Sequence, residues 1–179
     1  MKSFLILPLV IFLFVSCSEE KVKPQVGGMQ DSSKMPDQES WDSKVLMTED
    51  GILRAILFSD HITVYEDQNL KLLDKVKIDF YNEQHEKTTT LTSKRGKVDE
   101  KTKNLYAIEN VVAISDSGDT LWTEELMWDH KKQKITTDKF VTVASKKERI
   151  EGYGFESDQH LKNYVIFNIT FITQSTEIE

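Results

Sequence analysis

Cysteine is nearly absent from this chain, since Cys17 is the only one among 179 residues. A single thiol forms no internal disulfide, so the fold does not depend on a disulfide framework. Proline occurs only three times, and no long window shows the apolar spacing of an amphipathic helix. The remaining composition, 39% hydrophobic and 30% charged, suits one globular domain with its own core.

The sequence also lacks the common catalytic and nucleotide-binding motifs. No HExxH or Cys/His zinc spacing, no G-x-S-x-G elbow and no phosphate loop occurs. Gly152-Tyr153-Gly154 has no strand-loop-helix context and is expected to permit a bulge or bend. The histidines are interpreted as solvated turn residues or, for His61, as structural: His61, His85, His130 and His160. We therefore expect a protein that is not an enzyme and uses no cofactor or metal.

The chain has fewer basic than acidic residues, with 23 Lys and Arg against 30 Asp and Glu. The formal net charge is -7 and the pI is about 5.2. An acidic surface repels nucleic acid phosphates, and no basic run offsets this, so no nucleic acid partner is expected.

The N-terminus predicts export. Lys2 precedes an apolar run over residues 3–15 that is shorter than the ~20 residues of a membrane span, which favours a signal peptide over residues 1–16 rather than a short uncleaved anchor. The stretch Phe14-Val15-Ser16-Cys17 resembles the lipobox of bacterial lipoproteins, although Phe14 replaces the usual leucine. This resemblance implies that Cys17 is acylated through sulfur, whereas the alternative is a structural cysteine.

The mature chain divides by composition. Residues 17–44 are polar and contain Pro24, Pro36 and Gly27-Gly28, which predicts a flexible tether; Trp41 is a candidate to dock on the following domain. A β domain is expected over residues 45–173, followed by a tail at 174–179. Its β-branched and aromatic runs include 62–65, 76–81, 105–114, 140–143 and 164–172, and its polar turns include 82–87, 99–104, 116–119, 129–134 and 158–163. The pattern predicts an all-β sheet, sandwich or roll.

A repeat reinforces this prediction. Asp99, Asp129 and Asp158 recur at intervals of 30 and 29 residues, and each begins a turn between two strands. Apolar residues follow at even offsets, which keeps them on one face of a sheet. Such units bury that face by stacking on one another. The predicted inner face is Phe58, Val98, Leu105, Val111, Leu126, Trp128, Ile135, Val141, Val143, Phe155 and Ile166. It is either an ordinary core or a partly open apolar trough.

The ordered segments from Asp50 to about Phe171 resemble the LptC family and the wider LptA/OstA-like group. The resemblance runs through Asp50-Gly51-Ile52-Leu53-Arg54-Ala55, residues 70–80, Ser93-Lys94-Arg95-Gly96-Lys97-Val98-Asp99, residues 105–111, residues 121–129, Ile135-Thr136-Thr137-Asp138 and residues 150–155. It implies an antiparallel β-jellyroll, a V-shaped two-sheet roll of the OstA-like type.

The resemblance also implies a function. Similar proteins are membrane-anchored periplasmic carriers of lipopolysaccharide, which receive it from an inner-membrane ABC transporter of LptB, LptF and LptG and pass it to LptA along a β-jellyroll bridge to the outer membrane. Many such proteins have a transmembrane helix where this chain has a lipobox. The family resemblance favours the inner membrane, but Ser18 replaces the aspartate that retains some lipoproteins there, so the sequence leaves the outer membrane open as the alternative.

The physical chemistry fits a lipid carrier. Leaving an acyl chain of ~12 carbons in water costs roughly 10 kcal/mol at ~0.8 per CH₂, so a carrier needs chiefly an apolar lining. Local cations are interpreted as solvated charges, with phosphate contact as the alternative: Lys94, Arg95, Lys146, Lys147 and Arg149. The apolar C-terminal strand is a candidate partner edge through Tyr164, Val165 and Phe167. The alternative function is a structural or glycan-binding periplasmic lipoprotein.

Overall fold

Nine β-strands make up all the regular structure in the part of the chain that the computed structural model describes, residues 35–158, 161 and 163–174. They are β1 (Gln38–Glu49), β2 (Ile52–Tyr65), β3 (Leu70–Tyr81), β4 (Lys87–Asp99), β5 (Asn104–Ser115), β6 (Thr120–Asp129), β7 (Lys134–Ala144), β8 (Glu148–Ser157) and β9 (Tyr164–Gln174). Within those residues, no helix is long and apolar enough to cross a membrane.

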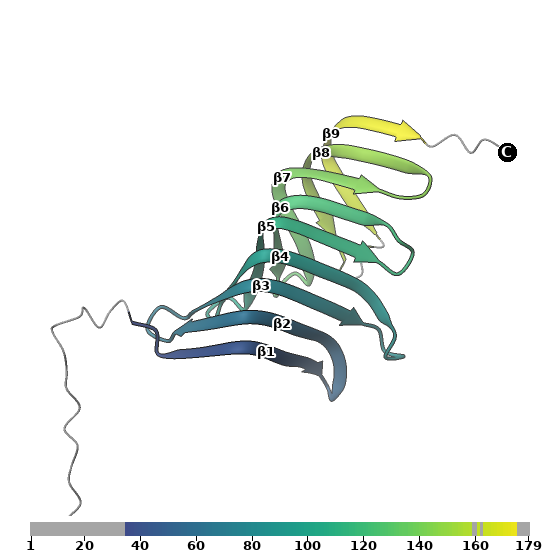
Figure 1. Cartoon of the computed structure of the whole chain (residues 1–179). Coiled ribbons are helices and arrows are strands. Elements are labelled where there is room, and N and C mark those ends of the chain that lie inside the picture. The colour runs from purple at the N-terminus through teal and green to yellow at the C-terminus, as the bar shows by residue number, and fades with distance from the viewer. Residues whose placement is uncertain (1–34, 159–160, 162, 175–179) are drawn as a thin grey trace, which may run out of the picture. The chain divides into compact units, whose positions relative to one another are not determined.

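The strands form one antiparallel sheet in the order of the sequence, from β1 to β9. Figure 1 shows them one above another, from purple β1 to yellow β9. Short turns join each strand to the next, as the polar turn clusters predict. The predicted all-β antiparallel fold of the jellyroll type is confirmed, and its two layers are the two halves of one continuous sheet.

The repeated aspartates close turns at one end of the sheet. The Oδ1 atom of Asp99 accepts hydrogen bonds from the backbone amides two and three residues further on, and Oδ1 of Asp129 accepts one from the amide three residues on. These backbone donors are the main cause that holds the pKa of both carboxyls below the usual range. The Asp158 carboxylate accepts a hydrogen bond from the Asn163 side chain. The Asp99 and Asp129 units therefore share the same turn chemistry.

A crease crosses the sheet at the middle of the strands. We use this name for the line of interrupted strand pairing that includes Asp42 in β1, Lys75 in β3, Glu109-Asn110 in β5 and Gly154 in β8, all of which have positive φ. In the β5–β6 and β7–β8 ladders the register also shifts at this line, as in a β-bulge, which bends a strand and increases its twist. The crease turns the two halves of the sheet toward each other.

Buried hydroxyls satisfy carbonyls where the crease interrupts the ladder. Ser59 donates through its hydroxyl to backbone carbonyls of β2 and β3 at 2.8 and 2.7 Å. Ser93 and Thr123 each donate to one further carbonyl at 2.8 Å. All three residues are buried, where an unpaired carbonyl is unfavourable. Small hydroxyl side chains on the inner face therefore stabilise the bend.

The core lies between the facing halves. It forms a single cluster of buried apolar side chains drawn from β2 to β9: Ala55, Leu57, Leu73, Val76, Ile78, Leu91, Ala107, Val111, Ala113, Leu121, Leu126, Ile135, Val141, Val143, Phe155 and Ile166. These residues alternate with exposed ones on either side of the crease, as a sheet with one covered face requires.

The sheet begins earlier than the predicted domain boundary at residue 45. β1 starts at Gln38, so the last part of the predicted tether pairs with β2. The polar stretch gives no strand pattern because the first five residues of an edge strand are exposed here. Residues 1–34 lie outside the described residues, and with them the signal peptide, Cys17 and most of the predicted tether; so do His160 and residues 175–179 of the predicted tail.

Candidate functional site

An apolar cavity of about 410 Å³ opens between the facing halves of the sheet. Its walls come from opposite ends of the strands, because Arg54 follows the β1–β2 turn whereas Lys103 lies in the β4–β5 turn at the other end. Most of the lining is apolar: Met47, Ala55, Ile78, Phe80, Leu91, Leu105, Ala107, Leu126, Trp128 and Ile135. Polar residues at its margin include Glu49, His130 and Gln133.

A second cavity of about 560 Å³ adjoins the first. It lies along β1 to β5, and its apolar lining is Val45, Met47, Leu57, Ile62, Val64, Leu70, Leu73, Val98 and Leu105. Met47 and Leu105 line both cavities. These two residues, which we call the waist, therefore mark where the cavities meet, and together the cavities form a chamber walled by β1–β7.

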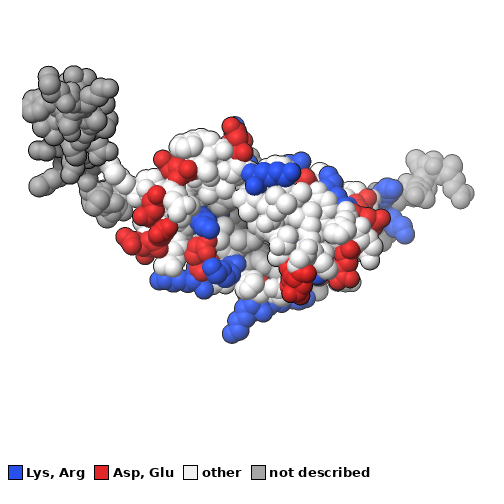
Figure 2. Space-filling view, turned by 90° about the horizontal axis from the view of Figure 1, so that it is seen from below, with Lys and Arg blue, Asp and Glu red and all other residues white. Residues whose placement is uncertain are grey.

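The cations at the chamber rim are already paired with carboxylates. Arg54 lies 3.1 Å from Glu49 and 3.7 Å from Glu83, while Lys71 and Lys103 both lie 2.6 Å from Glu100. The hydrogen bonds from Lys103 and Lys71 lower the pKa of Glu100. Figure 2 likewise shows both signs of charge interspersed over the face it presents. The chamber therefore combines a chiefly apolar lining with rim charges that are already paired.

Both edge strands expose apolar side chains. β9 pairs with β8 alone within the described residues, and exposes Val165 at 56% and Phe167 at 62%. β1 is the opposite edge and exposes Trp41 at 64% and Leu46 at 60%. Open edges with apolar side chains are suited to strand pairing with another chain.

A comparison with protein families agrees with this architecture. The sequence model described as "Lipopolysaccharide-assembly, LptC-related" matches residues 6–168, which is most of the chain. The chain belongs to the LptC-related family. A search with the chain against curated proteins finds no match. Membership of this family implies a role in lipopolysaccharide transport, at the membrane and in the periplasm. The LptC family is one of carriers and is not known for catalysis.

In this LptC-related chain, the predicted inner-face residues separate into two groups. Val98, Leu105, Leu126, Trp128 and Ile135 line the chamber. The remaining inward residues are buried in the core toward β9, outside the lining of both cavities: Val111, Val141, Val143, Phe155 and Ile166.

Phe58 lies on the other face of the sheet. It alternates with the buried Leu57 and Ser59 along β2, so its ring is directed outward. The ammonium groups of Lys44 and Lys77 lie 5.7 and 5.4 Å from its ring centroid. The predicted inner-face position of Phe58 is therefore wrong, because its ring is covered on the outer face by cation–π contacts with two lysines.

The candidate phosphate-binding cations are in part neutralised. Arg95 is ion-paired with Glu109, and Arg149 lies 2.7 Å from Glu151. These pairs lie on the outer face near the crease or at the end of a strand, whereas the chamber lining contains neither arginine. Their positions support the interpretation as solvated charges.

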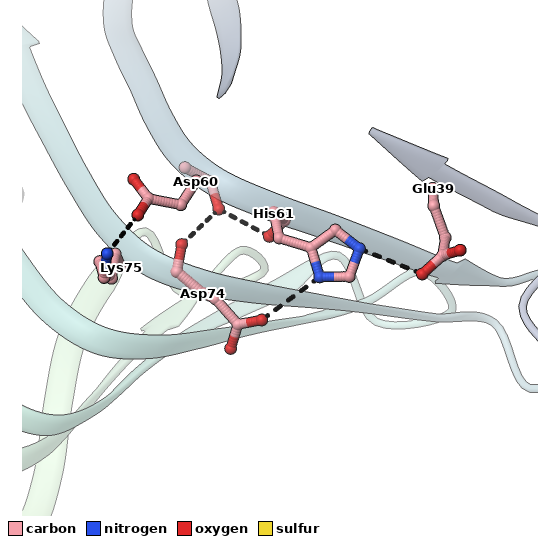
Figure 3. A network of polar contacts seen from close by, with 6 residues as sticks. Glu39, Asp60, His61, Asp74 and Lys75 are labelled. Atoms are coloured by element: carbon pink, nitrogen blue, oxygen red, sulfur yellow. Dashed lines mark hydrogen bonds and ion pairs between the residues drawn. The ribbon is translucent and has the colours of Figure 1, made fainter. Parts of the chain in front are cut away.

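His61 links the edge strand β1 to the neighbouring strands, as Figure 3 shows. Its Nε2 atom lies 3.1 Å from Glu39 of β1 and its Nδ1 atom 3.4 Å from Asp74 of β3. The Trp41 indole stacks on the imidazole with ring centroids 5.0 Å apart. These contacts join three strands on the outer face, which is a structural role. Trp41 therefore docks on the sheet as a member of β1. Within the described residues, no group of three or more His, Cys, Asp or Glu could hold a metal ion.

Several lining residues were absent from the predicted inner face: Met47, Ala55, Ile78, Leu91 and Ala107. The signal for Ile78 and Leu91 was present, because each alternates with polar residues along a β-branched strand. Ala55 and Ala107 are too small to stand out in a hydrophobicity pattern. Met47 belongs to an edge strand with little alternation, so only the fold identifies it.

Proposed function

We propose that this chain is a periplasmic carrier that holds lipopolysaccharide by its acyl chains inside the chamber and passes it along a bridge of β-jellyroll domains. The chamber is the observation that carries the proposal. It presents a continuous apolar lining across the waist, and its rim cations are paired with carboxylates. Each methylene that enters such a lining gains about 0.8 kcal/mol relative to water.

Photocrosslinking from the chamber tests the lipid site. A crosslinking amino acid at Trp128 or Leu126 is expected to attach to labelled lipopolysaccharide, because both side chains line the cavity. The same crosslinking amino acid at Thr136 or Asp138 is expected to attach roughly tenfold less lipopolysaccharide. A tenfold difference corresponds to about 1.4 kcal/mol of binding free energy. Thr136 pairs with Met127 on the outward side of β7, and Asp138 is exposed. Equal attachment from both faces would mean that the lipid does not enter the chamber.

The β9 edge is the proposed contact with the next carrier. Partners are an LptA-like bridge protein on one side and the LptB, LptF and LptG transporter, which supplies the energy, on the other. A crosslinker at Val165 or Phe167 is expected to form an adduct with the LptA-like partner in cells, since both side chains are exposed on an edge that has no further strand within the described residues. Tyr153, exposed on the neighbouring strand but one strand inward, is the control position. Absence of any adduct from β9 would overturn this contact.

Cys17 is the proposed membrane attachment, through acylation of the residue that follows the signal peptide. One acyl chain holds a protein to a membrane only marginally, so stable anchoring requires a second chain or signal. Mass analysis of the mature N-terminus, combined with membrane fractionation, determines whether Cys17 is acylated and which membrane holds the chain. An unmodified thiol in the mature protein would rule out the lipid anchor.

A further inference from the structure

The chamber does not extend along the whole sheet. Neither of its two cavities takes a lining residue from β8 or β9. Beneath those strands the interior is filled by side chains, with Val141 fully buried and Val111 and Phe155 each only 1% exposed. A lipid that travels from the chamber toward β9 therefore meets a packed section.

Two aromatic rings lie at the end of that packed section. Phe155 of β8 stacks on Tyr164 of β9, with ring centroids 5.7 Å apart and planes inclined by 23°. Ile166 is the register partner of Phe155 and points to the same inner face. Phe155 is buried, whereas Tyr164 is half-buried at the first position of β9. The pair thus separates the filled interior from solvent near the β9 edge.

Tyr164 also faces the opposite half of the sheet. Burial raises the pKa of its phenol, and the negative charges of Glu148 and Asp119 raise it further. Glu148 is paired with Gln174, at the far end of the β8–β9 ladder from Tyr164. The effect of these two carboxylates on the phenol indicates that the bent sheet brings Tyr164 toward the strand ends where Glu148 and Asp119 lie.

Strand β8, which carries Phe155, is bent at the crease. β8 contains Gly152 and Gly154 at the crease, and Gly154 has a φ of 76°. A register shift occurs in the β8–β9 ladder between Glu151 and Gly152. Gly152 permits the close approach of β9, because a Cβ atom there would lie 2.4 Å from the carbonyl oxygen of Asn168, and Gly154 adopts the left-handed backbone of the bend. The β8–β9 end is therefore bent at the crease next to the aromatic pair.

We propose that Phe155 and Tyr164 form a gate between the chamber and the β9 edge. Acyl chains rest in the chamber, and they reach the interior beneath β8 and β9 only when this ring pair moves away from the facing layer. This inference rests on the proposed carrier function and adds a closed state to it. In the closed state, the acyl chains stay in the chamber and do not reach the β9 edge, where the next protein is expected to bind.

Site-specific photocrosslinking on the purified full chain tests the gate. With fluorescent lipopolysaccharide as the probe, a crosslinker at Trp128 is expected to attach strongly, and one at Ile166 roughly tenfold less. Phe155→Leu keeps an apolar side chain but removes the ring stack, and it is expected to raise the Ile166 signal to about that of Trp128. Tyr164→Ala is expected to have the same effect, and its half-buried position makes it the milder change for folding.

The controls separate the gate from the carrier function. Tyr153→Ala removes an exposed ring from the outer face of β8 and is expected to leave the Ile166 signal unchanged. Strong attachment from Ile166 in the unaltered chain would overturn the gate while the carrier function stands. An unchanged Ile166 signal in both Phe155→Leu and Tyr164→Ala would also overturn it, and would identify the packed section as an ordinary core. Absence of attachment from Trp128 would overturn the carrier function itself.

Discussion

Replacing Gly152 with alanine is expected to detach β9 from β8 and to lower the free energy of unfolding by about 3 kcal/mol. A Cβ atom at this position would lie 2.4 Å from the carbonyl oxygen of Asn168 and 2.7 Å from a methyl group of Ile166. The first contact is with the backbone of β9, which no rotamer change can relieve. The strand must therefore shift, and the pairing of Gly152 with Ile169 must break.

Urea unfolding measures the stability loss, and amide hydrogen exchange locates it. Faster exchange is expected first in β9 and the adjoining half of β8. Gly118→Ala makes the same chemical change in a turn where nothing lies within 4 Å of the added atom. Because Gly118 has a positive φ, the alanine variant is expected to lower the free energy of unfolding by only about 1 kcal/mol, roughly the strain of a left-handed residue. Similar losses in both variants, or uniform exchange across the sheet, would contradict the close approach at Gly152.

The turns and the fold class could be predicted from the sequence because their causes are local. Asp99 and Asp129 accept hydrogen bonds from amides within three residues, so the same letters recur wherever the same turn recurs. Strands between such turns follow from the alternation of apolar and polar side chains. Along β5 the even spacing also persists across the crease, because Ala107 and Val111 are both buried on either side of Glu109-Asn110.

The crease itself could not be predicted, and it decides which side chains face the chamber. In β9 the register shift between Glu151 and Gly152 places Ile169 opposite the buried Gly152, so a constant alternation along the strand does not hold there. A bulge leaves no reliable mark in composition, since most positive-φ residues here are not glycine. The sequence did not predict the first residues of β1, from Gln38 onward, for a different reason. Backbone pairing with β2 and the His61 contacts keep them in the sheet, whereas no buried apolar side chain marks them as a strand.

In the proposed carrier, the two ends of the sheet have different roles, with the open chamber along β1–β7 and the packed section beneath β8 and β9. Storage of an apolar ligand needs space lined by side chains that tolerate variable contents, and a methionine at the waist is suited to this because its unbranched side chain fills irregular gaps. Transfer at an edge needs a strand free to pair. In the proposed carrier, a closed section between them keeps the acyl chains out of water while no partner is bound.

Replacing Leu105 with tryptophan is expected to divide the chamber and to reduce lipid attachment from Trp128 by about tenfold. Leu105 and Met47 are the two described residues that line both cavities, so an indole at position 105 occupies the lining that the cavities share. Enlarging a side chain in a packed core costs typically 1–3 kcal/mol. Leu105 is half-buried beside free volume, so the loss of stability is expected to lie at or below the lower end of that range.

Ile114→Trp is the matched control, because it enlarges an exposed apolar side chain on the outer face of the same strand. Thermal unfolding of both variants establishes that they fold alike, and photocrosslinking from Trp128 then reports access to the first cavity alone. In cells that depend on this chain, Leu105→Trp is expected to abolish growth and Ile114→Trp to support it, since an acyl chain blocked at the waist cannot advance toward β9. Normal growth and full attachment with Leu105→Trp would mean that the two cavities do not act as one lipid path, and that each binds its contents separately.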